Sequence, residues 1–131
     1  MVNYLAVLVA AVVSFLVGWL WYSKPVFGKV WMNLMGLKKE PKHEGMAKNI
    51  ALGFVATLVT AFIVADLAGM LGYTSAGEGA MLGFLVWLGF VATTTLSGVL
   101  WENKPWGVWL LNNAHSLVTL LLMGAIVGAW V

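Results

Sequence analysis

Hydrophobic residues occur in four long runs along the 131-residue chain, and short polar segments separate the runs. The runs cover about residues 3–22, 49–71, 78–100 and 107–131, and each is long enough to cross a bilayer, which takes about 20 mostly apolar residues. Hydrocarbon leaves no partner for free backbone polar groups, so each run is expected to be helical. The pattern predicts an all-α membrane protein, a four-helix bundle forming a single transmembrane domain over residues 1–131.

The composition supports this class and excludes others. Hydrophobic residues make up 62% of the chain and charged residues 9%, whereas soluble domains average about 45–50% and about 25%. This excludes a disordered chain, a nucleic-acid binder and an ordinary soluble enzyme. The chain has no cysteine, which rules out disulfides, cysteine-based zinc sites and a thiol nucleophile.

The lysines predict the orientation in the membrane. The connection over residues 23–48 carries most of them, Lys104 follows the third run, and residues 72–77 carry none. With four spans, the first and third connections face the same side, which the positive-inside bias assigns to the cytoplasm. We therefore expect a multi-pass protein of the cell inner membrane, with both termini outside and the lysine-rich loop 23–48 cytoplasmic.

The first connection also contains a short amphipathic pattern. Its apolar residues Phe27, Val30, Trp31, Leu34 and Met35 follow helical spacing. A proline suits the start of such a helix and a glycine its end, which predicts a helix over about residues 25–37. We expect this helix to lie in the membrane interface; the alternative is a structured loop packed under the bundle.

Two turns of the chain share a sequence pattern. Residues 18–25 (GWLWYSKP) align without a gap with residues 98–105 (GVLWENKP). The following spans align loosely, so the chain is interpreted as two helical hairpins forming a parallel repeat about an axis along the membrane normal. The alternative is chance similarity between two interface turns, which favour Trp, Lys and Pro.

The second of these turns is expected to be a rigid structural element. It comprises Trp101, Glu102, Lys104 and Pro105. Its acid can pair with Lys104 or Lys24, or accept a hydrogen bond from an indole.

Small residues recur at four-residue steps within the spans and predict close helix packing, because small side chains let backbones approach. The rows are Ala6, Ala10, Ser14 and Gly18 in the first span, Gly53, Thr57, Ala61, Ala65 and Gly69 in the second, and Gly124 and Gly128 in the fourth. Isoleucine at Ala61 or Gly18 should disrupt this packing. If the first row packs within the protomer, the Gly124 row stays free for a partner, or the reverse, so a homo-oligomer is expected.

Polar residues inside the spans are the candidate functional groups. A cluster in the inner half comprises His115, Asn112, Ser116, Thr119, Thr94 and Asn49. It can bind a small polar ligand or a proton, since histidine titrates near neutral pH, or it can serve interhelical hydrogen bonding, which is the favoured interpretation.

The one acid placed deep in a span, Asp66, lies near the outer end of the second span. An intramembrane acid is a functional candidate, but a carboxylate near the interface can also extend outward or cap a neighbouring element. One histidine and an acid in the opposite leaflet cannot complete a metal shell. No catalytic residue, metal site or cofactor is therefore expected.

Several short pieces resemble a known family. They are Trp21-Tyr22-Ser23, Phe27-Gly28 with Trp31, and Gly89-Phe90 through Thr94 to Trp101-Glu102 with Pro105-Trp106. The chain resembles the domain-of-unknown-function 1761 family of small bacterial four-span membrane proteins. This resemblance implies the architecture and assigns no activity.

The leading hypothesis is thus a non-enzymatic, homo-oligomeric integral membrane protein whose partner is the lipid bilayer, with no nucleic acid and no assigned small-molecule ligand. The alternatives are a small transporter or channel for a proton, ion or small polar solute, and an accessory subunit of a larger membrane complex.

Overall fold

The computed structural model describes residues 3–36 and 46–130, and this described part is helical throughout, without a strand. Four of its helices are long and apolar enough to cross a membrane: Tyr4–Trp21, Ala47–Met70, Ala76–Leu100 and Trp106–Ala129. The prediction of an all-α protein with four spans is confirmed. Among the predicted loop lysines, Lys38, Lys39 and Lys42 lie outside the described residues.

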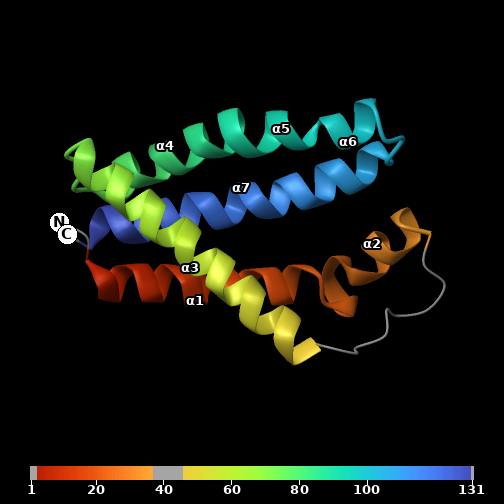
Figure 1. Cartoon of the computed structure of the whole chain (residues 1–131), viewed down its shortest axis with the longest axis horizontal. Helices are drawn as coiled ribbons and strands as arrows, with labels where there is room; N and C mark the ends of the chain where they lie inside the picture. Colours follow the sequence, from red (N-terminus) through yellow and green to blue (C-terminus); the bar gives the residue numbers. More distant parts are fainter. Residues whose placement is uncertain (1–2, 37–45, 131) are drawn as a thin grey trace.

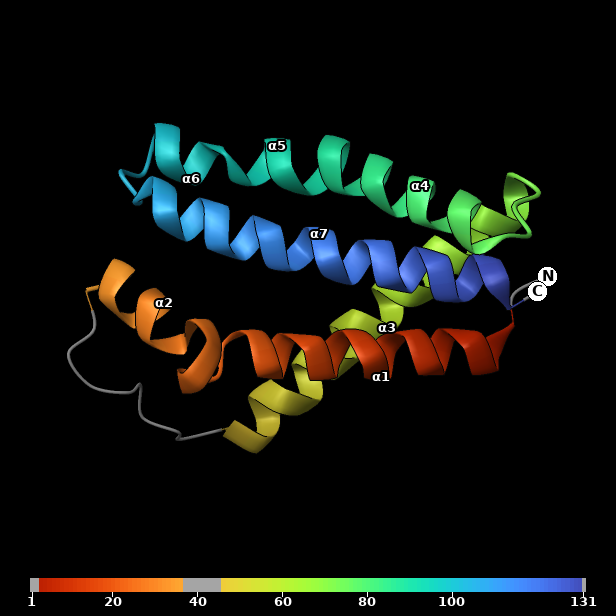
Figure 2. The same cartoon turned by 180° about the vertical axis from the view of Figure 1, so that it is seen from behind.

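The four spans run alternately up and down. The first, second and fourth spans are α1 (Tyr4–Trp21), α3 (Met46–Met70) and α7 (Trp106–Ala129). The third span consists of four consecutive segments, α4 (Ala76–Val86), η2 (Trp87–Ala92), α5 (Thr93–Thr95) and α6 (Ser97–Leu100). Helix α7 lies between the third span and α1, and α3 crosses the bundle obliquely (Figure 1). Both termini lie at one end (Figures 1 and 2), where the Asn3 amide donates to the Trp130 carbonyl at 3.2 Å.

The predicted helix of the first connection is present. It consists of a π-helical turn, η1 (Lys24–Gly28), followed by α2 (Lys29–Leu34), and it ends at Gly36, whose φ of +74° is left-handed. Helix α2 packs against the start of α7, because a Cβ on Gly107 would lie 2.8 Å from Cδ2 of Leu34. The segment is therefore a helix and not a loop, it contacts α7, and its position in the membrane interface stays a prediction.

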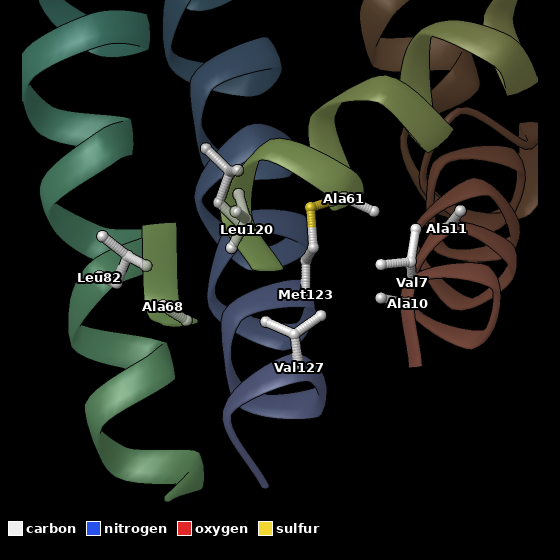
Figure 3. Close-up of a cluster of buried hydrophobic side chains, with 10 residues drawn as sticks. Val7, Ala10, Ala11, Ala61, Ala68, Leu82, Leu120, Met123 and Val127 are labelled. Atoms are coloured by element: carbon white, nitrogen blue, oxygen red, sulfur yellow. The ribbon is translucent and has the colours of Figure 1, made fainter. Parts of the chain in front are cut away.

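Small side chains form the centre of the bundle. The buried apolar cluster draws on α1, α3, α4 and α7 and consists of Val7, Ala10, Ala11, Ala61, Val64, Ala68, Leu82, Leu120, Met123 and Val127 (Figure 3). Ala10, Ala11 and Ala61 have no exposed surface at all. Alanine at these positions brings the helix backbones close together, which is how packing stabilises helices when lipid is as apolar as the core.

The closest approach joins the third span to α7 through glycines. A Cβ on Gly79 would overlap the carbonyl oxygen of Gly124, and a Cβ on Gly83 would overlap that of Leu120. The expectation that the Gly124 and Gly128 row stays free when the first row is occupied is wrong. The third span carries its own glycine row, Gly79-x-x-x-Gly83, and this row fills the α7 surface within the protomer.

The small-residue row of α3 is used only in part. Ala61 is fully buried, Gly53 and Thr57 are half-buried, and Gly69 is exposed with no atom near its missing side chain. The oblique course of α3 contributes to the difference, because its first turns diverge from the bundle, whereas its later turns bury Val64 and Ala68 in the apolar cluster (Figure 1).

Candidate functional site

Three adjoining cavities extend from the Lys104 turn to the middle of the bundle. The turn cavity, about 300 Å³, lies between α2, the third span and α7 and includes Thr95, Lys104 and Ser116. The central cavity, about 290 Å³, is lined from all four spans and shares Ser116 with the turn cavity. The side cavity, about 430 Å³, lies between α1 and α3 and shares Ser14, Thr57 and His115 with the central cavity.

His115 occupies the wall between the central and side cavities. A Cβ on Gly18 would lie 3.0 Å from His115 Nε2, so the glycine provides the space that the imidazole fills. The ring centroids of Tyr22 and Trp21 lie 5.2 Å and 6.0 Å from that of the imidazole. The missing side chain at Gly18 therefore leaves room for the His115 imidazole, in addition to letting the backbones of α1 and α7 approach.

Three buried polar atoms near these cavities have no hydrogen-bond partner within the described residues: Ser14 Oγ, Trp21 Nε1 and His115 Nε2. Leaving a buried polar group unsatisfied costs about 1–3 kcal/mol, so such atoms are rare and call for an explanation. A hydroxyl can donate and accept, and an imidazole nitrogen does either according to its tautomer. Together they can hold a molecule that forms hydrogen bonds.

The predicted polar cluster is assembled in part. His115, Ser116 and Thr119 all line the central cavity, and the neighbouring Asn112 accepts a hydrogen bond of 2.6 Å from the Tyr22 hydroxyl. The Ser116 hydroxyl donates to the backbone carbonyl of Asn112 at 3.1 Å. Tyr22 and Ser14 also belong to this group, although the sequence indicated a turn for Tyr22 and a packing row for Ser14.

Two predicted members of the cluster lie elsewhere. Thr94 is exposed and donates to the Phe90 carbonyl of its own helix, whereas Thr95 faces α7 and lies 3.2 Å from Asn113 Oδ1. The π-helical segment η2 precedes them, and its wider turn shifts which side chain faces α7. Asn49 is exposed at the start of α3 and lines none of the three cavities, because α3 diverges from the bundle there (Figure 1).

The π-helical segment is held by two indoles. Trp87 Nε1 donates to the Asn113 carbonyl at 2.8 Å, and Trp109 Nε1 donates to the Ala92 carbonyl at 3.2 Å. Asn113 is 4% exposed and donates from its amide to the Trp109 carbonyl at 2.9 Å. Sequence reasoning missed this pairing, which fixes the third span against α7 beside the turn cavity.

Asp66 is separate from this site. It is half-buried, one turn before the end of α3 at Met70, and lines none of the three cavities. Within the described residues it has no hydrogen bond or ion pair between side chains. The same part of the chain brings together no group of three His, Cys, Asp or Glu residues that could hold a metal ion.

The interface turn has a defined geometry. Glu102 pairs with Lys104 at 3.4 Å, and both side chains are exposed. Asn103 adopts a left-handed φ of +56°, and the Lys104 amide donates to the Gly98 carbonyl at 3.0 Å. Pro105 caps α7, and Trp101 is 83% exposed. Lys104, one of the partners considered for the acid, pairs with it, and the side chain of Lys24 lies outside the described part of the chain.

These features define an all-helical, multi-pass membrane protein with mainly apolar cavities in its bundle that a few polar side chains help to line. A family model described as "Protein of unknown function (DUF1761)" matches residues 5–128, nearly the whole chain, and the chain belongs to this family. The family resemblance predicted from the Trp-Tyr-Ser and Trp-Glu pieces is thereby confirmed. No curated protein and no solved structure matches the chain.

Proposed function

We propose that this protein is a small, non-enzymatic transporter or channel that admits a small polar solute or a proton from the Lys104 end of the bundle to His115. The observation that carries the proposal is a pair of buried atoms, Ser14 Oγ and His115 Nε2, that have no hydrogen-bond partner in the described part of the chain and belong to side chains that line the central cavity. A satisfied structural cluster would leave neither atom without a partner.

The adjoining cavities supply the route. The turn cavity begins beside Lys104 and reaches Ser116, which also lines the central cavity. The central cavity then presents hydroxyls from α3 and α7, including Thr57, Thr60 and Thr119. Polar groups within membrane spans face the bundle interior or a water-filled cavity, so this arrangement supports entry of a polar species along the half of α7 nearer Lys104.

The surroundings of His115 support a non-enzymatic role. Ser14 and His115 could in principle act as nucleophile and base, but no hydrogen bond joins them. The described residues that line the central and side cavities include no carboxylate to orient the imidazole. A nucleophile and base pair usually has both features.

The proposal is tested by flux into proteoliposomes. Proton entry is followed with a trapped pH dye and solute entry by osmotic swelling in glycerol. His115→Gln keeps a polar side chain but changes its shape and removes the titratable group, so we expect at least one flux to fall. Asp66→Asn is the control, because Asp66 lines none of the three cavities. Equal flux in wild-type and empty vesicles, or in wild-type and His115→Gln, would exclude the proposed route.

We also propose that the Lys104 end faces the cytoplasm of a cell with an inner membrane, and that the two turns derive from a duplicated hairpin. Lys29, Lys48 and Lys104 support this orientation, because the first two lie where the first connection joins the spans and the third lies in the turn at the same end. The duplication rests on the shared Lys-Pro turns at Pro25 and Pro105.

A homo-oligomer is a second proposal. Gly89, Thr93 and Ser97 recur at four-residue steps along the third span, and all three are exposed. Such a row lets another helix approach closely in a membrane. Thr93→Cys in the cysteine-free chain should form a covalent dimer under mild oxidation. A monomer in that experiment, or copurification of unrelated chains in place of a second copy, would favour the accessory-subunit alternative.

A further inference from the structure

The side cavity differs from the other two in where it lies and what lines it. It occupies the gap between α1 and α3, and its apolar lining includes Phe15, Trp19 and Ile50. Trp19 is 71% exposed and Ile50 is 45% exposed, and both belong to membrane-spanning helices. The surface that they expose in the bundle is therefore surface that meets lipid, and the cavity opens sideways toward the bilayer.

The inner wall of the same cavity is polar. Ser14, Thr57 and His115 lie there, and Ser14 Oγ and His115 Nε2 are buried without a hydrogen-bond partner among residues 3–36 and 46–130. Ser14 is 5% exposed, so its hydroxyl cannot be satisfied by bulk water. The Thr57 hydroxyl donates to the Gly53 carbonyl at 2.9 Å and can still accept a hydrogen bond.

We infer that the side cavity binds an uncharged amphipathic molecule that enters from the bilayer, with a hydroxyl or carbonyl head at Ser14 and His115 and an alkyl chain along Phe15, Trp19 and Ile50. The volume of about 430 Å³ lies in the range of small-molecule sites, about 300–1,000 Å³. This goes beyond the proposed passage of a polar species, because the ligand comes from lipid and not from water, although both use His115.

The head group of the ligand is uncharged, because the cavity offers no permanently charged side chain to pair with it. No Lys, Asp or Glu is among the described residues that line it. Burying an unpaired charge is far more costly than burying a hydroxyl with hydrogen-bond partners. A phospholipid phosphate would find no lysine here, whereas an alcohol can accept a hydrogen bond from the Ser14 hydroxyl and donate one to His115 Nε2.

The test uses hexadecanol that carries a photoreactive diazirine on its chain, added to the full-length protein in phosphatidylcholine nanodiscs. We expect saturable labelling of peptides that contain Phe15, Trp19 or Ile50, with competition by unlabelled hexadecanol and not by hexadecane. Ser14→Ala should weaken competition about fivefold, the effect of losing one hydrogen bond. Thr94→Val is the matched control, because it also removes a hydroxyl and Thr94 is exposed on the third span outside the cavity.

A second variant keeps the test independent of folding. A Cβ on Gly53 would lie 3.8 Å from Phe15, an ordinary contact, so Gly53→Leu should fold and fill the cavity. Its saturable labelling should disappear. Labelling that spreads over all lipid-facing helices, or competition by hexadecane equal to that by hexadecanol, would overturn the inference. If His115→Gln loses flux but the wild-type protein shows no saturable labelling, the lipid-facing site is overturned and the proposed polar route stands. If the wild-type protein shows saturable labelling but carries no flux, the polar route is overturned and the site stands.

Discussion

Individual side chains in this bundle stabilise it through a few directed hydrogen bonds. The indoles of Trp87 and Trp109 each reach a backbone carbonyl on the opposite helix, at Asn113 and Ala92. These bonds lie at either end of η2, where a π-helical turn disturbs the regular pattern of the third span. The two indoles therefore hold the irregular turn in place.

Trp87→Phe should lower stability, because it keeps an aromatic ring but leaves the Asn113 carbonyl without its indole donor. We expect a loss of about 0.6–1.7 kcal/mol, the range for interhelical hydrogen bonds in membranes, measured as a lower thermal midpoint in detergent. Trp101→Phe is the matched control, since Trp101 is 83% exposed and should change little. Equal midpoints for the two variants would show that the bond contributes nothing.

At this scale the sequence predicts which residue types matter better than where they point. His115 is identifiable because it is the one histidine inside a span, and it does line two cavities. Ser14 shares its row with alanines, so the spacing could not separate packing from ligand binding. Thr94 and Thr95 are adjacent in a run of threonines, and the phase of the helix after η2 decides which one reaches Asn113.

Helices in this bundle approach one another most closely through glycine. Gly79→Ala should destabilise the protein by about 1–3 kcal/mol, the cost of overpacking a close contact, because the new methyl group would meet the Gly124 carbonyl. Gly77→Ala is the control in the same helix. No atom lies near its added methyl group, and alanine favours helix over glycine by about 1 kcal/mol. A chemical-denaturation series should therefore move in opposite directions for the two variants.

Ala61→Ile tests the contact of α3 with the other spans. Ala61 has no exposed surface and belongs to the apolar cluster, so three added carbons have no space there. We expect a destabilisation of about 1–3 kcal/mol. Ala51→Ile is the matched control, because Ala51 is exposed on the same helix. If the two variants melt together, α3 does not pack on the bundle through Ala61.

The positions of helices can be predicted from the sequence where the thickness of the bilayer determines them. They are predicted poorly where packing between helices determines their geometry. The four spans follow from the length of apolar sequence that a membrane requires, and the short helix at Lys29–Leu34 follows from its apolar spacing. The π-helical turn over Trp87–Ala92 leaves no mark on hydropathy, because the extra residue in the turn changes the phase and not the polarity.

The whole molecule is asymmetric in a way that matters for its cavities. The α4 part of the third span packs closely on α7 through glycines. Helices α1 and α3 instead cross obliquely (Figure 2), and the side cavity lies between them. The two hairpins thus share a turn sequence without sharing a packing mode. A duplicated ancestor would explain the shared turns, and the glycines at Gly79 and Gly83 would explain why one hairpin closed and the other stayed open.

The proposed orientation places the two ends of the bundle on opposite sides of the membrane. Thr74 lies in the connection at the end of both termini, and Glu102 lies in the turn at the opposite end; both are exposed. Because the chain has no cysteine, Thr74→Cys and Glu102→Cys each introduce a single reactive thiol.

A membrane-impermeant maleimide added to spheroplasts should label Thr74→Cys at once and Glu102→Cys only after the membrane is permeabilised. The reason is electrostatic, because short connections rich in lysine are retained in the cytoplasm. The cysteine-free chain controls for background labelling. If Glu102→Cys were labelled before Thr74→Cys, the orientation would be the opposite of the proposed one, and the arrangement of the helices would be unaffected. Labelling of both positions from one face would contradict the crossing of the third span, because only α4 to α6 separate the two residues in the chain.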